Sequence, residues 1–130
     1  CDLIKDASDF IHVKYYSGSQ SMSHLFSQGF VGSELFKSDQ ELRGKLNEKL
    51  PAHIKLADHM IRPDAKNYKL VFAIATNKKL PEDLPLFSKI NLKNFHKSIR
   101  NFGYEVRICK IDVDPNIYKR KLCKPQKNKL

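Results

Sequence analysis

Near the start of the chain, hydrophobic and polar residues alternate in a pattern that predicts two paired strands. Two apolar runs, 2–4 and 10–16, are separated by the polar stretch 5–9, whose composition is typical of a turn. In the second run, alternation predicts one face made of Phe10, His12, Lys14 and Tyr16. The pattern therefore predicts a β-hairpin at the N-terminal end.

Apolar residues then recur at helical spacing. The predicted stripe consists of Met22, Leu25, Phe26 and Phe30. We expect Ser21 to cap this helix, and Gly29 to interrupt it and allow a neighbouring element to approach closely. A second helix is predicted over about 39–49, behind Ser38 and ahead of Pro51.

The remaining segments complete an alternating pattern. Residues 51–67 carry a weak signal and are predicted to form a loop, whereas the continuous apolar run 70–75 is typical of a strand covered on both faces. A third helix is expected over about 91–101 and a last strand over about 104–111. The predicted element order is ββααβαβ.

This order predicts one α/β domain over residues 1–114, with a mixed four-stranded sheet and helices packed on its faces. Residues 115–130 are rich in Lys and Arg and free of acids after Asp114, so we expect a mobile basic tail. Because the chain opens on Cys1 in strand-like sequence without Met, we expect it to be part of a longer protein.

Charge narrows the choice of partner. Lys and Arg outnumber Asp and Glu by 24 to 14, which gives a formal charge of +10 and favours a polyanion, DNA in preference to RNA. An anionic membrane surface, an acidic protein and solubility alone are the alternatives. No apolar run is long enough to cross a bilayer, and three cysteines without CxxC spacing argue against a disulfide framework or a zinc site. We therefore expect no membrane partner and a cytoplasmic location.

Candidate chemistry lies in the hairpin. Asp2 in one strand and His12-Val13-Lys14 in the next resemble the core of metal-dependent nucleases, where an acid and then acid-x-Lys project from neighbouring strands. In that arrangement carboxylates hold Mg²⁺ or Mn²⁺, with Asp2 as the metal ligand here, and Lys14 stabilises developing charge. His12 stands where the pattern has an acid, and His is a poor ligand for Mg²⁺ but accepts softer divalent ions.

A family resemblance points the same way. The run Phe10 to Lys14 and the block Ser23-His24-Leu25-Phe26-Ser27-Gln28-Gly29 resemble a sporadically distributed prokaryotic family of uncharacterised proteins, as do Leu84 to Lys89 and Gly103-Tyr104. The matches span about residues 1–111. That family is itself similar to the restriction-endonuclease-like superfamily, so the resemblance implies its fold and a catalytic set of Asp2, His12, Lys14 and Gln28. It also implies that this chain is the C-terminal part of longer members, whose upstream segment would supply a further acid.

Contacts to nucleic acid are expected in two places. Ser21, Ser23 and His24 lie at the start of the first predicted helix, where free backbone donors and the helix dipole favour a phosphate. The alternative is that the serines cap the helix and the histidine is structural. In the tail, Lys119, Arg120 and Lys121 would add non-specific phosphate contacts, unless they form a solvated terminus.

Three functions follow from these features. The first is a nucleic-acid-binding, nuclease-like domain with metal-dependent phosphodiester hydrolysis in a defence or restriction system. The second is a non-catalytic module that keeps a degenerate nuclease fold for binding nucleic acid or a partner, which His12 in place of an acid favours. The third is an interaction domain with incidental charge, and a homodimer is left open.

Overall fold

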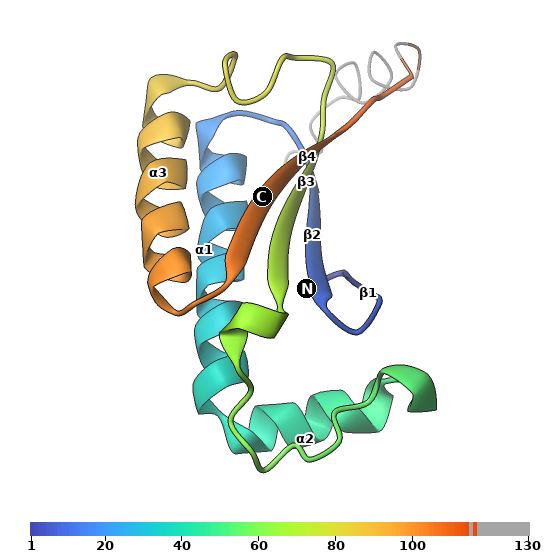
Figure 1. The fold of residues 1–130 in the computed structure, drawn as a ribbon. Coiled ribbons are helices and arrows are strands. Elements are labelled where there is room, and N and C mark those ends of the chain that lie inside the picture. The colour runs from blue at the N-terminus through green and yellow to red at the C-terminus, as the bar shows by residue number, and fades with distance from the viewer. Residues whose placement is uncertain (115, 117–130) are drawn as a thin grey trace, which may run out of the picture.

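A mixed sheet of four strands organises the chain, whose computed structural model describes residues 1–114 and 116 (Figure 1). The strands are β1 (Leu3–Lys5), β2 (Asp9–Tyr15), β3 (Lys69–Ala75) and β4 (Glu105–Ile111), in the spatial order β1-β2-β3-β4. The first pair is antiparallel and the other two pairs are parallel. The predicted mixed α/β class, the hairpin and the four strands are confirmed, and the strand bounds agree to within two residues.

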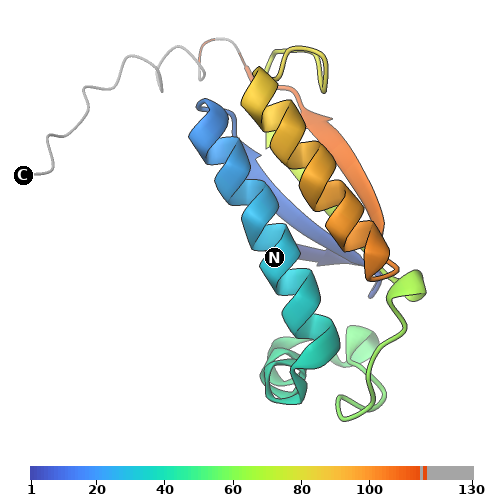
Figure 2. The same cartoon turned by 90° about the vertical axis from the view of Figure 1, so that its left-hand side faces the viewer.

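The two long helices lie side by side on one face of this sheet (Figures 1 and 2). They are α1 (Ser19–Ser38) and α3 (Leu86–Asn101), and the shorter α2 (Gln40–Lys49) turns away from the end of α1. Within residues 1–114, no helix covers the opposite face, so the prediction of helices on both faces is wrong for the described chain. Val13, Tyr15 and Ile111 are exposed there. None of the described helices combines the length and the apolar character needed to span a membrane.

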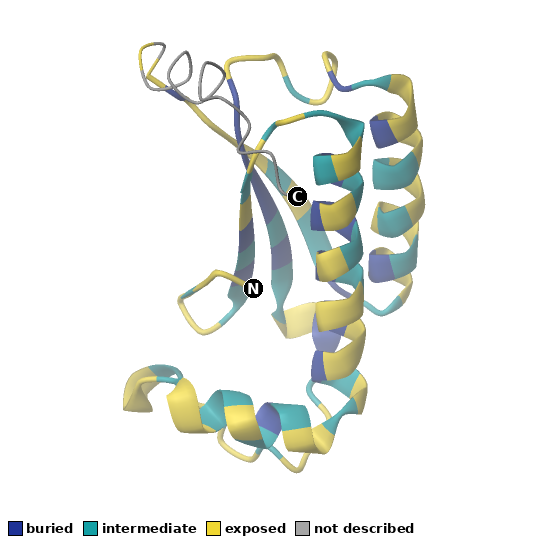
Figure 3. Cartoon of the chain, turned by 180° about the vertical axis from the view of Figure 1, so that it is seen from behind, coloured by how far each residue is buried: buried dark blue, intermediate teal, exposed yellow. Residues whose placement is uncertain are grey.

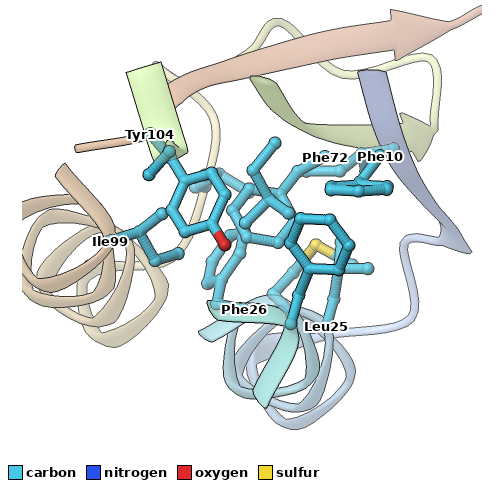
Figure 4. Packing of buried hydrophobic residues seen from close by; sticks show 12 residues of the cluster. Phe10, Leu25, Phe26, Phe72, Ile99 and Tyr104 are labelled. Atoms are coloured by element: carbon cyan, nitrogen blue, oxygen red, sulfur yellow. The ribbon is translucent and has the colours of Figure 1, made fainter. Parts of the chain in front are cut away.

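The core fills the space between the sheet and the two long helices (Figures 3 and 4). Phe72 of β3 meets the edge of the Phe26 ring from α1, with ring centroids 5.1 Å apart. A Cβ added to Gly29 would lie only 2.5 Å from the Phe72 ring, so glycine is what lets α1 approach the strand. The predicted close approach is confirmed, but the predicted interruption is wrong because α1 runs through Gly29 without a break.

Helix boundaries depart from the predictions at three points. The first helix starts after Gly18, which has φ 109°, and the Ser21 hydroxyl instead donates to the Gly18 carbonyl at 2.8 Å. Helix α2 is capped by Asp39, whose side chain accepts from the amide of Leu42, and not by Ser38. Helix α3 begins at Leu86, directly after Pro85, and not at 91. Proline is well suited to a helix start, where its missing N–H costs nothing.

A buried arginine holds the corner between α1 and α2. Arg43 is 3% exposed and donates to the carbonyls of Phe36, Lys37 and His59. These bonds satisfy the end of α1 and fasten the segment after α2. That segment, predicted to be a loop, contains the short 3₁₀ turns Ala52–Ile54 and Ala65–Asn67.

Candidate functional site

The hairpin brings Asp2 and His12 to one edge of the sheet. Asp2 directly precedes β1; its amide donates to the Ile11 carbonyl at 2.9 Å and its carboxylate accepts from the Val13 amide at 2.8 Å. These bonds extend the pairing of the two strands beyond β1. The carboxylate is exposed and close enough to His12 to affect the pKa of its imidazole.

His12 projects from β2 toward α1 and is 5% exposed. Its ring lies 6.0 Å from the Phe72 ring, centroid to centroid, and its Cε1 lies 4.0 Å from where a Cβ on Gly32 would be. Burial lowers the pKa of His12 from 6.5 to about 4, and the nearby Asp2 carboxylate opposes this shift. The imidazole is therefore neutral at pH 7.

Lys14 and Gln28 lie at the same height along this edge. Strand β2 and helix α1 run in opposite directions (Figure 1), and His12 is level with Gly32. Two residues onward along β2 is about 6.6 Å, and one turn back along α1 is about 5.4 Å. These steps lead to Lys14, on the face of β2 that meets α1, and to Gln28, which is exposed and contacts His24 on the surface of α1. Lys14 is half-buried and forms no ion pair with any described residue.

The donor set does not fit a hard divalent cation. Within residues 1–114 and 116, no three His, Cys, Asp or Glu side chains come together in a way that could hold a metal ion. Asp2 is the carboxylate beside His12, and that imidazole is buried on the helix side of β2. Mg²⁺ prefers several oxygen ligands in octahedral geometry. The predicted Mg²⁺ or Mn²⁺ at Asp2 thus finds too few ligands in the described part of the chain.

The residues expected to bind phosphate at the start of α1 have partners within the protein. The Ser21 hydroxyl accepts from the Ser17 amide at 3.1 Å as well as donating to Gly18, and Ser23 accepts from the Asn91 side chain at 2.6 Å. His24 is exposed, with its Nε2 3.1 Å from the Gln28 side-chain nitrogen. The two side chains thus contact each other one turn apart on the surface of α1. Lys119, Arg120 and Lys121 lie outside the described residues.

A basic stripe on α3 was missed by the sequence analysis. It consists of Lys89, Lys93, His96, Lys97 and Arg100, all of them exposed. Spacings of three and four residues place these side chains on one side of the helix. The helix contains no Asp or Glu, and none of the stripe's lysines or its arginine forms an ion pair with a described residue. The spacing was readable in the sequence, but the late predicted helix start left Lys89 outside it.

The stripe borders the outer edge of the sheet. Lys89, Lys93 and His96 line a shallow hollow against β4, together with Glu82 and the apolar side chains of Pro81, Leu92 and Ile108. Lys110 of β4 lies on the helix-facing side of the sheet but pairs with Asp112 at 3.4 Å. From Lys89 to Arg100 the stripe is roughly 16 Å long at 1.5 Å per residue.

Comparison with known proteins identifies a family for this chain. A family model described as a family of unknown function, DUF6119, matches residues 1–112. No curated protein and no solved structure matches the chain. The predicted resemblance to an uncharacterised family is thus confirmed, while its similarity to nucleases stays a prediction.

Proposed function

The chain belongs to the DUF6119 family, whose function is unknown, and we propose that it is a nucleic-acid-binding domain whose phosphate-binding surface is the basic stripe of α3. The observation that carries this proposal is the stripe itself: exposed cations along one side of a helix that has no acid. A net charge of +10 agrees with a polyanionic partner.

The physical basis is the release of counterions from phosphate. Duplex DNA carries one phosphate about every 3.4 Å along each strand, so a stripe roughly 16 Å long extends past several of them. Lys93 and Lys97 can each pair with a phosphate without first breaking an ion pair with a described residue. Phosphate contacts of this kind position a protein on nucleic acid without reading its sequence.

A charge-reversal experiment tests the proposal. In the full-length protein, Lys93→Glu with Lys97→Glu should weaken binding to a 20-base-pair duplex by at least tenfold at low salt. The matched control is Lys5→Glu with Lys55→Glu, which makes the same change of net charge at exposed positions away from α3. Equal losses in the two variants would mean that net charge, and not the stripe, governs binding. Absence of salt-dependent binding by the wild type would refute the proposal.

A second candidate function is phosphodiester hydrolysis at the edge between β2 and α1. It is favoured by Lys14, which lies two residues beyond His12 on the same face of β2 and has Asp2 near that histidine, as the nuclease resemblance implies. A lysine at such a place would stabilise charge on a phosphate undergoing attack. Because the described residues do not fit a metal ion, we place no reaction step on one, and the non-catalytic module remains the better supported form.

Cleavage assays separate the two forms. Plasmid and single-stranded DNA or RNA would be incubated with the wild type and with Lys14→Ala, each with Mg²⁺ or Mn²⁺. Cleavage by the wild type that Lys14→Ala abolishes would establish the catalytic form. If both proteins bind nucleic acid and neither cleaves it, the domain is the non-catalytic module.

A further inference from the structure

A cleft of about 470 Å³ opens beside His12, between β2, the second half of α1, and α2. Its apolar walls are formed by Phe10, Phe36, Leu42, Leu46 and Leu70. Phe10 and Phe36 meet edge to face, with ring centroids 4.8 Å apart, and give the cleft a rigid aromatic wall. A mainly apolar cleft of this volume with a few polar groups is typical of small-molecule sites.

His12 is the polar group in this wall that lacks a partner. It is 5% exposed, lines the cleft, and makes no hydrogen bond to any described residue. The neighbouring Ser33 differs, because its hydroxyl already donates to the Phe30 carbonyl at 2.8 Å. The ring nitrogens of His12 are not among the fully buried polar atoms that lack a partner, so they reach the cleft, where a ligand can bond to them.

The rim of the cleft carries two acids and two lysines, and one of the lysines is placed to meet an anion. Glu41 pairs with Lys45 at 3.3 Å, and the Asp39 carboxylate accepts from the Leu42 amide at 3.1 Å. Lys49 also lines the cleft and forms no ion pair with a described residue. The Asp39 carboxylate keeps its charge but lies at the opposite end of α2, so Lys49 is the cation available to a ligand at the C-terminal end of that helix.

We infer that this cleft binds a nucleotide, with the base against Phe10 and Phe36, the base edge on His12 and one phosphate toward Lys49. A neutral imidazole offers one donor and one acceptor, which complements the mixed edge of a base. Enzymes that extrude bases from a strand hold them in this way, between apolar or aromatic side chains and edge contacts. The inference deepens the proposed function, since the nucleotide comes either free from solution or as an unpaired residue of a bound strand.

The first test uses the four nucleoside 5′-monophosphates of RNA as probes. Each would be added to the full-length protein while the His12 imidazole signals are followed by NMR and affinity by calorimetry. At least one probe should shift His12, and His12→Leu should bind it at least tenfold more weakly. His53→Leu, which changes an exposed histidine outside the cleft, should bind as the wild type does. If no probe shifts His12 at millimolar concentration, the inference is wrong.

Two further variants guard against misfolding and locate the phosphate. Gly32→Leu places a side chain in the cleft from a solvent-exposed helix position and should block binding even if His12→Leu does not fold. Lys49→Gln should weaken binding of the monophosphate but not of the matching nucleoside. Wild-type affinity in Gly32→Leu would place the nucleotide elsewhere.

Oligonucleotides distinguish the two sources and separate this inference from the proposed function. A single strand with its normal bases should bind more tightly than the same strand with abasic sites if the cleft accepts an unpaired residue. Monophosphate binding with equal affinity for the two strands identifies a free nucleotide as the ligand. The inference is overturned if no monophosphate binds and the two strands bind equally well. If Lys93→Glu with Lys97→Glu also abolishes binding of the strands, the proposed function still stands.

Discussion

At the β4 end of the sheet α3 holds its cations in solvent, whereas at the β2 end the polar side chains of His12 and Lys14 turn inward toward α1. The α3 end exposes cations around a shallow hollow, whereas the β2 end has a cleft lined by a neutral imidazole. Binding through exposed charge responds to salt, because it releases counterions. Binding through a buried neutral group responds to pH and to the shape of the cleft. The two ends can therefore be tested independently.

Acidification should produce the largest difference between the two ends of the sheet, because it lowers the stability of the fold through His12. The pKa of His12 is about 4 in the folded protein, against an ordinary value of 6.5, because burial disfavours the charged form. Between these values the unfolded chain binds more protons, so the stability of the fold is intact above pH 6.5 and falls as pH drops toward 4. The loss reaches about 3 kcal/mol at 1.36 kcal/mol per unit.

Urea unfolding at pH 7.5 and pH 4 measures this loss. The wild type should lose about 3 kcal/mol more than His12→Leu, which removes the titrating group but keeps an apolar side chain. Every other titrating group is common to the two proteins, so its contribution cancels in the comparison. A difference between the two proteins that is the same at both pH values would contradict the burial of a neutral His12.

Two glycines of α1 test how the packing differs between the centre of the sheet and the cleft. Gly29→Ala pushes a methyl group against the Phe72 ring, where its Cβ would lie at 2.5 Å, and should destabilise the fold by about 2 kcal/mol. Gly32→Ala meets only His12 at 4.0 Å and should stabilise it by about 0.5–1 kcal/mol, the gain for alanine within a helix. Thermal unfolding of both variants measures the contrast. Equal effects would mean that α1 does not lie over the sheet as described.

A single substitution of a lysine on α3 by a neutral residue tests the salt dependence of binding more closely. Lys97→Gln should reduce the slope of log affinity against log salt by about 0.9 if Lys97 neutralises one phosphate of duplex DNA. It should leave stability within about 0.5 kcal/mol, because the side chain is exposed and unpaired among the described residues. Lys55→Gln is the control with the same loss of charge. An unchanged slope for Lys97→Gln would remove this residue from the interface.

The hydrophobic pattern predicted the strands well, because alternation in β2 and the apolar run of β3 are local signals that the register of the sheet bears out. It did not predict the uncovered face of the sheet, because a run such as Val71-Phe72-Ala73 looks the same whether a helix or only side chains of the neighbouring strands shield it. Sequence reasoning also missed Arg43, which reads as a surface residue of α2 until its carbonyl partners are known. Hydrogen bonds to carbonyls of other elements do not show in the pattern of hydrophobic and polar residues.

The candidate site divides in the same way. Strand alternation correctly put His12 and Lys14 on one face, whereas the contact between His24 and Gln28 was found only in the structure. The burial of His12 was not predictable, because it depends on Gly32 lying opposite it from another element. A buried histidine can be structural or can be kept for a ligand. The substitution with the smallest expected effect on stability distinguishes these two roles.

Replacing His12 by leucine at pH 7.5 should leave the fold as stable as the wild type or raise its stability by about 0.5 kcal/mol. No charge is lost, because the imidazole is already neutral, and no described hydrogen bond is broken. Leucine would pack against Phe72 in place of an imidazole that makes no hydrogen bond within the described chain. Chemical unfolding at constant pH measures the change. A loss of 2 kcal/mol or more would mean that His12 is a structural residue, whereas stability gained together with binding lost is the behaviour expected of a group retained for a ligand.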